Sequence, residues 1–219
     1  MSMLISPERQ YPEGTREGFY PVIGGKYNDT PQLWVPEGLQ KADTIEFVKQ
    51  NRNNIPKPDV IIGIARGGVG FAMQLNYLYK VKRMLMMQTD GFDNDNNPLE
   101  TPRIIAAPRD EDIADAKVIW LADELVDNFA AIPVAGDYLA EHAPNACIIS
   151  IVQYRKRKLG ALAASRADYE HRIVEDIWLD FETQASIELL ERRHAELPEA
   201  YPNYQSDIGM YATWAARKI

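Results

Sequence analysis

Residues 58–68 of the 219-residue chain read PDVIIGIARGG, and this stretch decides the fold. Up to Ala65 it is short and nearly continuously apolar, which is typical of a strand buried on both faces of a parallel sheet. A glycine-containing turn ends the run. Next come apolar residues at helical spacing, namely Phe71, Leu75 and Leu78. The order of strand, turn and helix predicts the first unit of an α/β domain.

The rest of the chain repeats this alternation. We expect further strands over 82–88, 118–122, 146–152 and 173–179, and further helices over 39–51, from near residue 132 onward, and over 186–194. Residues 89–116 are polar, charged and interrupted by proline, which predicts a long functional loop. Strands that alternate with helices predict a doubly wound, mainly parallel sheet.

Three details of packing are also predicted. The 39–51 helix is expected to turn one side inward, with Phe47 at its flank, and that side comprises Leu39, Ala42, Ile45 and Val48. In the helix near residue 132, the expected buried stripe comprises Ile132, Ala135 and Leu139. The single cysteine, Cys147, lies in an apolar stretch and is expected to pack in the core.

Composition excludes several classes of protein. The 24 basic and 32 acidic side chains give a net charge of −8, which argues against a nucleic-acid partner. An apolar fraction of 46% excludes intrinsic disorder, and one cysteine excludes a disulfide scaffold. No apolar run approaches the ~18 residues of a membrane helix, and the N-terminus lacks a secretory pattern. We therefore expect a cytoplasmic protein without a membrane partner.

Ligands of such sheets bind at the carboxyl ends of the strands, so the turns after Ala65, Ala122 and Val152 are the candidate sites. In the first, Arg66 and two glycines offer positive charge and free backbone amides to an anion. It is not a P-loop, because Val69 stands where that motif has lysine. The alternative is a tight turn that needs glycine only for its geometry.

The second candidate is the acidic segment Asp123-Glu124-Leu125-Val126-Asp127. Three carboxylates this close repel one another, so Mg²⁺, an arginine or the hydroxyl groups of a ribose must offset their charge. The alternative is a set of acids at a helix N-terminus that face solvent.

The third candidate lies after Val152. The basic run 154–158 would grip a phosphate or a carbonyl oxygen, or would form a solvated loop. Trp178 would stack on a planar base or pack in the core. A calcium loop from Asp93 fails, because Pro98 and Ile104 stand where glycine and glutamate are required. The three histidines lack the spacing of metal ligands, and no serine-hydrolase motif is present.

In order and spacing, these segments resemble the type I phosphoribosyltransferases, and most closely the enzymes acting on xanthine, guanine or hypoxanthine. The resemblance covers roughly residues 34–182 and rests on 58–68, 118–127 and the region of Trp178. It implies a small hood beside the sheet. We therefore expect an N-terminal arm (1–36), a phosphoribosyltransferase-like domain (37–195) and a C-terminal tail (196–219). The hood would come from about 153–182 and the arm.

The resemblance implies transfer of ribose 5-phosphate from phosphoribosyl pyrophosphate to a purine-type base, with Mg²⁺ as cofactor. Residues 89–110 would be a mobile loop that shields the reaction, and a homo-oligomer (dimer or tetramer) is expected. The implied pyrophosphate loop comprises Ala65, Arg66, Gly67 and Gly68. Asp123 and Glu124 would hold the ribose and, indirectly, Mg²⁺. Asp127 would be the general base, Arg155 would contact the purine 6-oxygen, and Trp178 and Leu179 would flank the base.

The chain departs from the family at the loop that holds the 5-phosphate. The family has Thr-Gly-Gly-Thr or a close variant there, and this chain has Asn128, Phe129, Ala130 and Ala131. Two hydroxyls and two glycines are missing, although the Asn128 amide restores one polar contact. Two alternatives therefore stand beside the enzyme: a regulatory protein that binds nucleotide or phosphoribosyl pyrophosphate without turnover, and an enzyme whose substrate carries no 5-phosphate or anchors it differently.

Overall fold

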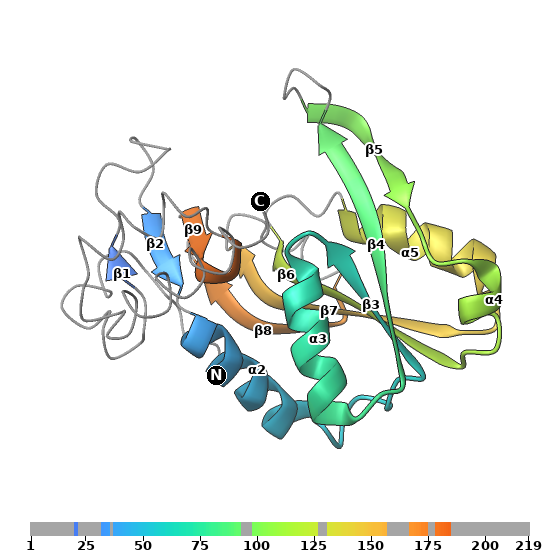
Figure 1. The fold of residues 1–219 in the computed structure, drawn as a ribbon, viewed down its shortest axis with the longest axis horizontal. Coiled ribbons are helices and arrows are strands. Elements are labelled where there is room, and N and C mark those ends of the chain that lie inside the picture. Colours follow the sequence, from blue (N-terminus) through green and yellow to red (C-terminus); the bar gives the residue numbers. More distant parts are fainter. Residues whose placement is uncertain are drawn as a thin grey trace, which may run out of the picture.

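The computed structural model describes residues 20–21, 32–35, 37–92, 98–126, 131–156, 167–174 and 178–184. Their main feature is a six-stranded sheet in the order β5-β4-β3-β6-β7-β8, shown in Figure 1. The strands are β3 (Val60–Ala65), β4 (Arg83–Phe92), β5 (Pro98–Ala106), β6 (Val118–Val126), β7 (Cys147–Lys156) and β8 (Tyr169–Val174). All neighbouring pairs are parallel except β4 and β5. The predicted mainly parallel α/β sheet is confirmed.

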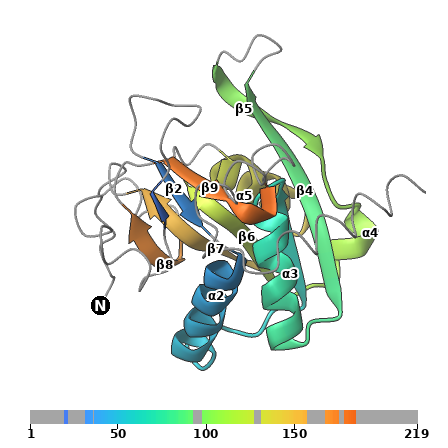
Figure 2. The same ribbon diagram turned by 60° about the vertical axis from the view of Figure 1, so that its left-hand side comes forward.

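Helices cover both faces of this sheet. On one face, α2 (Glu37–Asn51) and α3 (Gly68–Tyr79) enclose a core that includes Phe47, Phe71 and Trp120. On the other face, α5 (Ala131–His142) encloses a second core. The two views in Figures 1 and 2 show α2 and α3 side by side and α5 behind the strands, with the short α4 (Asp110–Ile113) at one end. None of the described helices has the length and hydrophobicity needed to cross a bilayer.

A second, three-stranded sheet lies beside α2. It comprises β1 (Tyr20–Pro21), β2 (Gln32–Val35) and β9 (Trp178–Phe181), and the 3-10 turn η3 (Glu182–Gln184) follows directly. The strands β2 and β9 are parallel, although they lie far apart in the sequence. Buried Val35, Leu179 and Phe181 pack with Tyr154 of β7, so this small sheet is joined to the large one by an apolar cluster.

The helix predicted over 39–51 is present, but its predicted inward face is wrong. Ala42 is exposed, and Leu39, Ile45 and Val48 are only partly buried. The buried side chains are instead Gln40, Asp43, Thr44 and Phe47. The reason is that this side of α2 meets polar groups of β7 and β8, so polar residues there gain hydrogen bonds when buried. In α5, by contrast, the predicted stripe of Ile132, Ala135 and Leu139 is buried as expected.

The expected polar loop over 89–116 is wrong in its first part, which forms the antiparallel hairpin of β4 and β5. Arg103 pairs with Asp90 across it, with 3.0 Å between the Nη2 and Oδ2 atoms. Charged residues suit this position because the hairpin projects beyond the rest of the sheet, as Figure 1 shows. The side chains of Arg103 and Asp90 are 57% and 35% exposed there.

Two strands run further than expected. The sequence predicts ends at Ala122 and Val152, yet β6 continues to Val126 and β7 to Lys156. The first part of the acidic segment is therefore strand, and neither a turn nor a helix start. The basic run is not a solvated loop at its start, because Tyr154, Arg155 and Lys156 are all buried.

Two smaller predictions are also wrong. Cys147 is exposed, because it begins β7 at the open end of the strand. The strand predicted over 173–179 is instead the end of β8 and the start of β9, which belong to different sheets. The predicted 186–194 helix and most of the terminal arms lie outside the described residues, and the predicted domain division stays a prediction.

Candidate functional site

A pocket of about 420 Å³ opens at the carboxyl ends of β3 and β6. Five parts of the fold line it: the turn after β3, the end of β6, the β4–β5 hairpin, the first residue of α5 and the β9–η3 segment. The lining residues are Ala65, Arg66, Gly67, Thr89, Asp90, Gly91, Pro102, Glu124, Leu125, Ala131, Leu179, Phe181 and Gln184. The pocket lies where ligands bind in open α/β sheets.

The turn after β3 lies against β6 so closely that a Cβ atom at Gly67 or Gly68 would overlap atoms of β6. A Cβ atom on Gly68 would lie 2.9 Å from Cα of Asp123 and would overlap the carbonyl oxygen of Ala122. A Cβ atom on Gly67 would lie 2.8 Å from Cδ of Glu124. Glycine is therefore required at position 68, where the contacts are with backbone atoms, while at position 67 the contact is with the flexible side chain of Glu124. The peptide bond between Ala65 and Arg66 is cis.

The same turn offers positive charge to the pocket. The α3 helix begins at Gly68. The N–H groups of Val69 and Gly70 donate to the carbonyl oxygens of Arg66 and Gly67 at 3.4 and 3.3 Å, while those of Gly67 and Gly68 have no such partner among the described residues. The helix dipole adds partial positive charge at this end. Arg66 is exposed and forms no ion pair with a described residue. This combination of free amides and a guanidinium suits a phosphate or pyrophosphate group.

Two adjacent carboxyl groups lie opposite the turn. Burial raises the pKa of Asp123 to about 7, partly offset by a hydrogen bond of 2.9 Å from the backbone N–H of Glu124. Burial and the neighbouring Asp123 raise the pKa of Glu124 to about 8. Both groups therefore hold protons readily near neutral pH in the free protein. A ligand that brings hydroxyl donors or a cation would stabilise their charged forms.

The remaining walls come from two segments far apart in the sequence. Thr89, Asp90, Gly91 and Pro102 belong to the β4–β5 hairpin, while Leu179, Phe181 and Gln184 belong to β9 and η3. Leu179 and Phe181 are buried and apolar, so they suit the face of a planar ring. The pocket therefore has an anion-binding wall at Arg66 and Gly67, an acidic wall at Glu124 and an apolar wall at Leu179 and Phe181.

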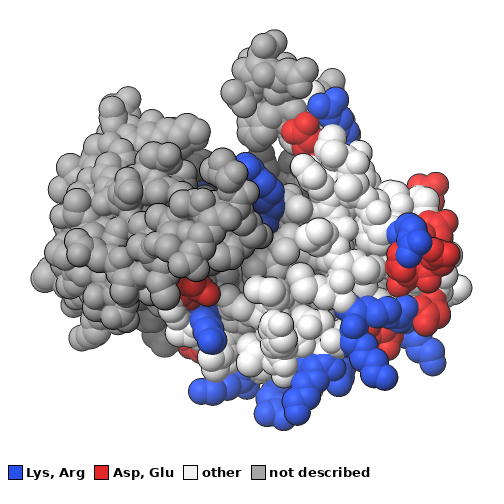
Figure 3. All heavy atoms as spheres, viewed as in Figure 1, with Lys and Arg blue, Asp and Glu red and all other residues white. Residues whose placement is uncertain are grey.

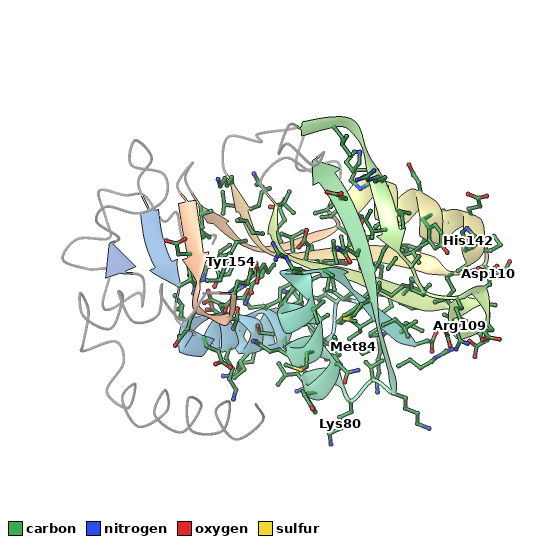
Figure 4. The ribbon with its side chains drawn as sticks, turned by 45° about the horizontal axis from the view of Figure 1, so that its top comes forward. Lys80, Met84, Arg109, Asp110, His142 and Tyr154 are labelled. Carbon is green, nitrogen blue, oxygen red and sulfur yellow. The ribbon has the colours of Figure 1, made fainter. Side chains whose placement is uncertain are left out.

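A buried ionic cluster supports the apolar wall from behind. The carboxyl group of Asp43 on α2 accepts hydrogen bonds from Arg172 and from the Tyr154 hydroxyl, the latter at 2.7 Å. Burial alone would raise the pKa of Asp43, but His171, Arg172 and Tyr154 outweigh it and hold the pKa below its usual value. In Figure 4 Tyr154 lies on the side of α2 and β9, far from His142 and Asp110.

The same cluster offers the one group of three metal-type ligands in the described part of the chain, namely Asp43, Glu46 and His171. The Arg172 guanidinium already contacts both carboxylates, at 3.5 Å from Glu46. A cationic side chain therefore occupies the place of an ion. This cluster is not the predicted Mg²⁺ position, which is at Asp123 and Glu124.

The structure brings most predicted site residues together. Ala65, Arg66, Gly67, Glu124, Ala131 and Leu179 line the pocket. Gly68 and Asp123 do not line it, but they lie against each other next to Gly67 and Glu124. Arg155 does not line it: its guanidinium is buried and pairs with Glu170 at 2.7 Å. Trp178 begins β9, and its side chain lies outside the described part. Asp127, Asn128, Phe129 and Ala130 also lie outside the described residues.

Among the residues that line the pocket, Phe181 and Gln184 were not predicted, and the hairpin residues were predicted only as part of the segment 89–110. Pro102 and Gly91 gave no signal, because a proline or glycine in a polar stretch indicates a turn in most contexts. Phe181, by contrast, could have been predicted from the sequence. It lies two residues after Leu179, and residues two apart in a strand lie on the same face. That period of two extends the apolar wall beyond the residues that were predicted.

Two hollows of similar volume lie elsewhere. One of about 450 Å³ is lined by residues of α5, β6 and β7, including Asp137, and by Asp168, which directly precedes β8. The other, of about 520 Å³, lies at the edge of the molecule where β3 and β4 begin, and its lining includes Lys57, Lys80 and Lys82. Figure 3 shows the basic side chains along this lower edge and a largely uncharged face over α3 and β4. Neither hollow combines a glycine turn with paired acids.

Comparisons with known proteins agree with this geometry. The model of the phosphoribosyl transferase domain matches residues 38–178. A comparison with curated proteins found no match. Solved structures that share the fold include two purine phosphoribosyltransferases and a hypothetical protein. The Helicobacter pylori xanthine-guanine-hypoxanthine phosphoribosyltransferase has a TM-score of 0.57 and 17% identity, covering 74% of this chain and 99% of that one. The Pyrococcus horikoshii purine phosphoribosyltransferase has a TM-score of 0.58 and 19% identity, covering 71% of this chain and 95% of that one.

The third structure is a hypothetical protein of Neisseria gonorrhoeae with bound ppGpp, at a TM-score of 0.63 and 20% identity, covering 78% of this chain and 97% of that one. These likenesses concern the fold. The family model covers well over half of the chain, and it spans the glycine turn and both acids. The chain therefore belongs to the type I phosphoribosyltransferase domain family.

Proposed function

We propose that the protein transfers ribose 5-phosphate from phosphoribosyl pyrophosphate to a purine-type base. The observation that carries the proposal is the shared pocket of the Arg66 turn and Glu124, with an apolar wall at Leu179 and Phe181. A phosphoribosyl pyrophosphate molecule needs an anion site beside a site for its ribose hydroxyls, and a base needs a flat apolar surface.

In the proposed reaction, a bond forms between a purine nitrogen and C1 of the ribose, and the bond from C1 to pyrophosphate breaks. Arg66 and the amides of the Gly67-Gly68 turn stabilise the charge that develops on the leaving pyrophosphate. Asp123 and Glu124 hold the ribose hydroxyls. Asp127 accepts the proton that the purine nitrogen loses. The β4–β5 hairpin lines the pocket, and in this proposal it covers the substrates and excludes water.

The acid pair fits the Mg²⁺ that the family typically uses. Mg²⁺ commonly binds through one or two carboxylates together with substrate phosphates and water, and Asp123 and Glu124 supply two buried carboxyl groups beside the anion site. Bound there through hydroxyls or water, Mg²⁺ would neutralise the pyrophosphate. We also propose that Arg155 reaches the base only by leaving Glu170, and that Trp178 flanks the base.

A second candidate is a regulatory protein that binds nucleotide or phosphoribosyl pyrophosphate without turnover. The sequence of residues 128–131 favours it, because Phe129, Ala130 and Ala131 offer no hydroxyls and no glycines to a 5-phosphate. The Neisseria gonorrhoeae structure of this fold has ppGpp bound, which agrees with a nucleotide ligand. Under either candidate we propose a cytoplasmic homo-oligomer with small-molecule ligands and no nucleic-acid partner.

A labelled-base assay tests the first candidate. Hypoxanthine, guanine, xanthine and adenine are each incubated with phosphoribosyl pyrophosphate and Mg²⁺, and nucleotide formation is measured. We expect turnover with a 6-oxopurine that needs both co-reactants. Calorimetry with the same ligands separates the candidates: tight nucleotide binding without turnover identifies the regulator, and no binding of either ligand contradicts both.

Matched variants connect the result to the pocket. Arg66→Ala removes charged hydrogen bonds to pyrophosphate, which we expect to weaken phosphoribosyl pyrophosphate binding by roughly 10- to 150-fold. Arg109→Ala is the control, because Arg109 is exposed and its ion pairs with Glu111 and Asp112 lie on α4. Equal effects of the two variants would show that overall charge, and not the pocket, sets the affinity.

A further inference from the structure

Gln40 in the first turns of α2 bridges the acidic wall and the β9–η3 segment. It is 3% exposed, and its side-chain amide has a partner on each side. Nε2 donates to Oε2 of Glu124 at 3.4 Å, and Oε1 accepts from Oγ1 of Thr183 at 3.2 Å. A single buried amide therefore contacts a carboxyl group that lines the pocket and a residue of η3.

The backbone of Gln40 is held as firmly as its side chain. Its carbonyl oxygen accepts from Nε2 of Gln153 at 2.7 Å and from Oγ1 of Thr44 at 2.8 Å. The Thr44 hydroxyl also lies 2.6 Å from Oε1 of Gln74 on α3. These contacts connect α2 to β7 and α3, so Gln40 reaches Glu124 from a rigid base.

The η3 turn has a second attachment beside the first. The carboxylate of Glu182 accepts from the backbone N–H of Glu37, the first residue of α2, at 2.8 Å. Burial raises the pKa of Glu182, partly offset by this hydrogen bond. Two contacts therefore hold η3 on the start of α2, and Gln184 at the end of η3 lines the pocket.

We propose that Gln40 is a positioning residue that orients Glu124 toward the ribose and fixes the apolar wall of β9 relative to it. The inference rests on the proposed function, because it assigns Glu124 to the ribose and β9 to the base. A glutamine suits this task because its amide donates to a carboxylate and accepts from a hydroxyl at the same time. Leucine, of similar size, does neither.

The experiment compares Gln40→Leu with Thr44→Val. Both variants remove buried polar contacts from the same side of α2 one turn apart, and only the first removes contacts with Glu124 and Thr183. We expect Gln40→Leu to weaken binding of Mg²⁺–phosphoribosyl pyrophosphate by roughly three- to tenfold more than Thr44→Val does. Calorimetry measures both, and urea unfolding checks that the two variants lose similar stability.

Hydrogen exchange provides a readout that needs no ligand. Gln40→Leu should increase deuterium uptake in residues 178–184, and Thr44→Val should leave it near the wild-type level. Thr183→Val should raise uptake there as well and add little in combination with Gln40→Leu, because the two side chains share one contact. Unchanged uptake in Gln40→Leu, or equal increases in Gln40→Leu and Thr44→Val, overturns the proposal.

The two readouts fail separately. If the wild-type protein binds no phosphoribosyl ligand, the proposed function fails, and hydrogen exchange still decides whether Gln40 fixes the β9–η3 segment. If the wild type binds the ligand but Gln40→Leu and Thr44→Val lose equal affinity, the proposed function stands and the positioning role is refuted.

Discussion

Replacing Gly68 by alanine tests whether the glycine turn is shaped by its contact with β6. The new Cβ would lie 2.9 Å from Cα of Asp123 and 3.2 Å from the carbonyl carbon of Ala122. Both are backbone atoms of a strand that is hydrogen-bonded on each side, so they cannot move alone. Overpacking of this kind costs about 1–3 kcal/mol, and the better helix propensity of alanine returns at most about 1 kcal/mol.

The expected net loss is therefore about 1–2 kcal/mol of unfolding free energy. With a urea dependence of about 2 kcal/mol per molar, the midpoint of unfolding should fall by about 0.5–1 M. Gly70→Ala is the matched control. Gly70 lies two residues further along the same helix with no atom within 4 Å of its added Cβ, so this variant should be neutral or gain about 0.5–1 kcal/mol.

Gly67→Ala separates stability from binding. Gly67 has φ −59° and ψ −52°, which alanine adopts freely, and the clash is with the movable Glu124 side chain. We expect little change in the urea midpoint but weaker binding of phosphoribosyl pyrophosphate, because the carboxyl group is displaced. The reasoning is refuted if Gly68→Ala and Gly70→Ala have the same midpoint, since contact with β6 would then not restrict the turn.

Three further predictions follow from buried charges and from the altered loop. Burial raises the pKa of Asp123 from 3.8 to about 7 and that of Glu124 from 4.5 to about 8. From about pH 4 to about pH 8, the folded protein therefore binds more protons than the unfolded chain does. Unfolding free energy of the ligand-free protein should fall as pH rises through that window, and Asp123→Asn with Glu124→Gln should flatten the dependence in urea titrations. Arg172→Met leaves the Asp43 carboxylate buried without its cation and should cost about 3–5 kcal/mol in the same assay, with partial recovery when Asp43→Asn is added. Restoring Thr-Gly-Gly-Thr at residues 128–131 should tighten phosphoribosyl pyrophosphate binding by roughly two to four orders of magnitude in calorimetry, whereas a loss of binding would show that the native ligand is anchored differently.

The strands of the large sheet could be predicted because their burial on both faces leaves a plain apolar run. Residues 60–65 and 118–122 contain no signal that competes with it. The ends of β6 and β7 could not be predicted in the same way. Asp123, Glu124 and Arg155 are charged, and charge in a sequence indicates solvent. In the fold, Arg155 pairs with Glu170 and Glu124 lines the pocket, so the strands continue through these charged residues.

The predicted inward face of α2 was wrong for a related reason, because polar residues are buried there. Apolar periodicity selects Leu39, Ala42, Ile45 and Val48, whereas the side that packs carries Gln40, Asp43 and Thr44. Some of their partners come from more than a hundred residues away, namely Tyr154 for Asp43 and Gln153 for Gln40. No local pattern reports partners at that distance. The glycine turn and acid pair were predictable because each is a short local motif at a strand end.

The central claim is that one pocket holds a phosphoribosyl group between the glycine turn and the acid pair. A crystal structure of the protein with Mg²⁺ and phosphoribosyl pyrophosphate tests it most directly. The account predicts the pyrophosphate on the amides of Gly67 and Gly68 and the ribose hydroxyls on Asp123 and Glu124. Density for the ligand in another hollow, or an empty pocket at saturating ligand, would contradict it.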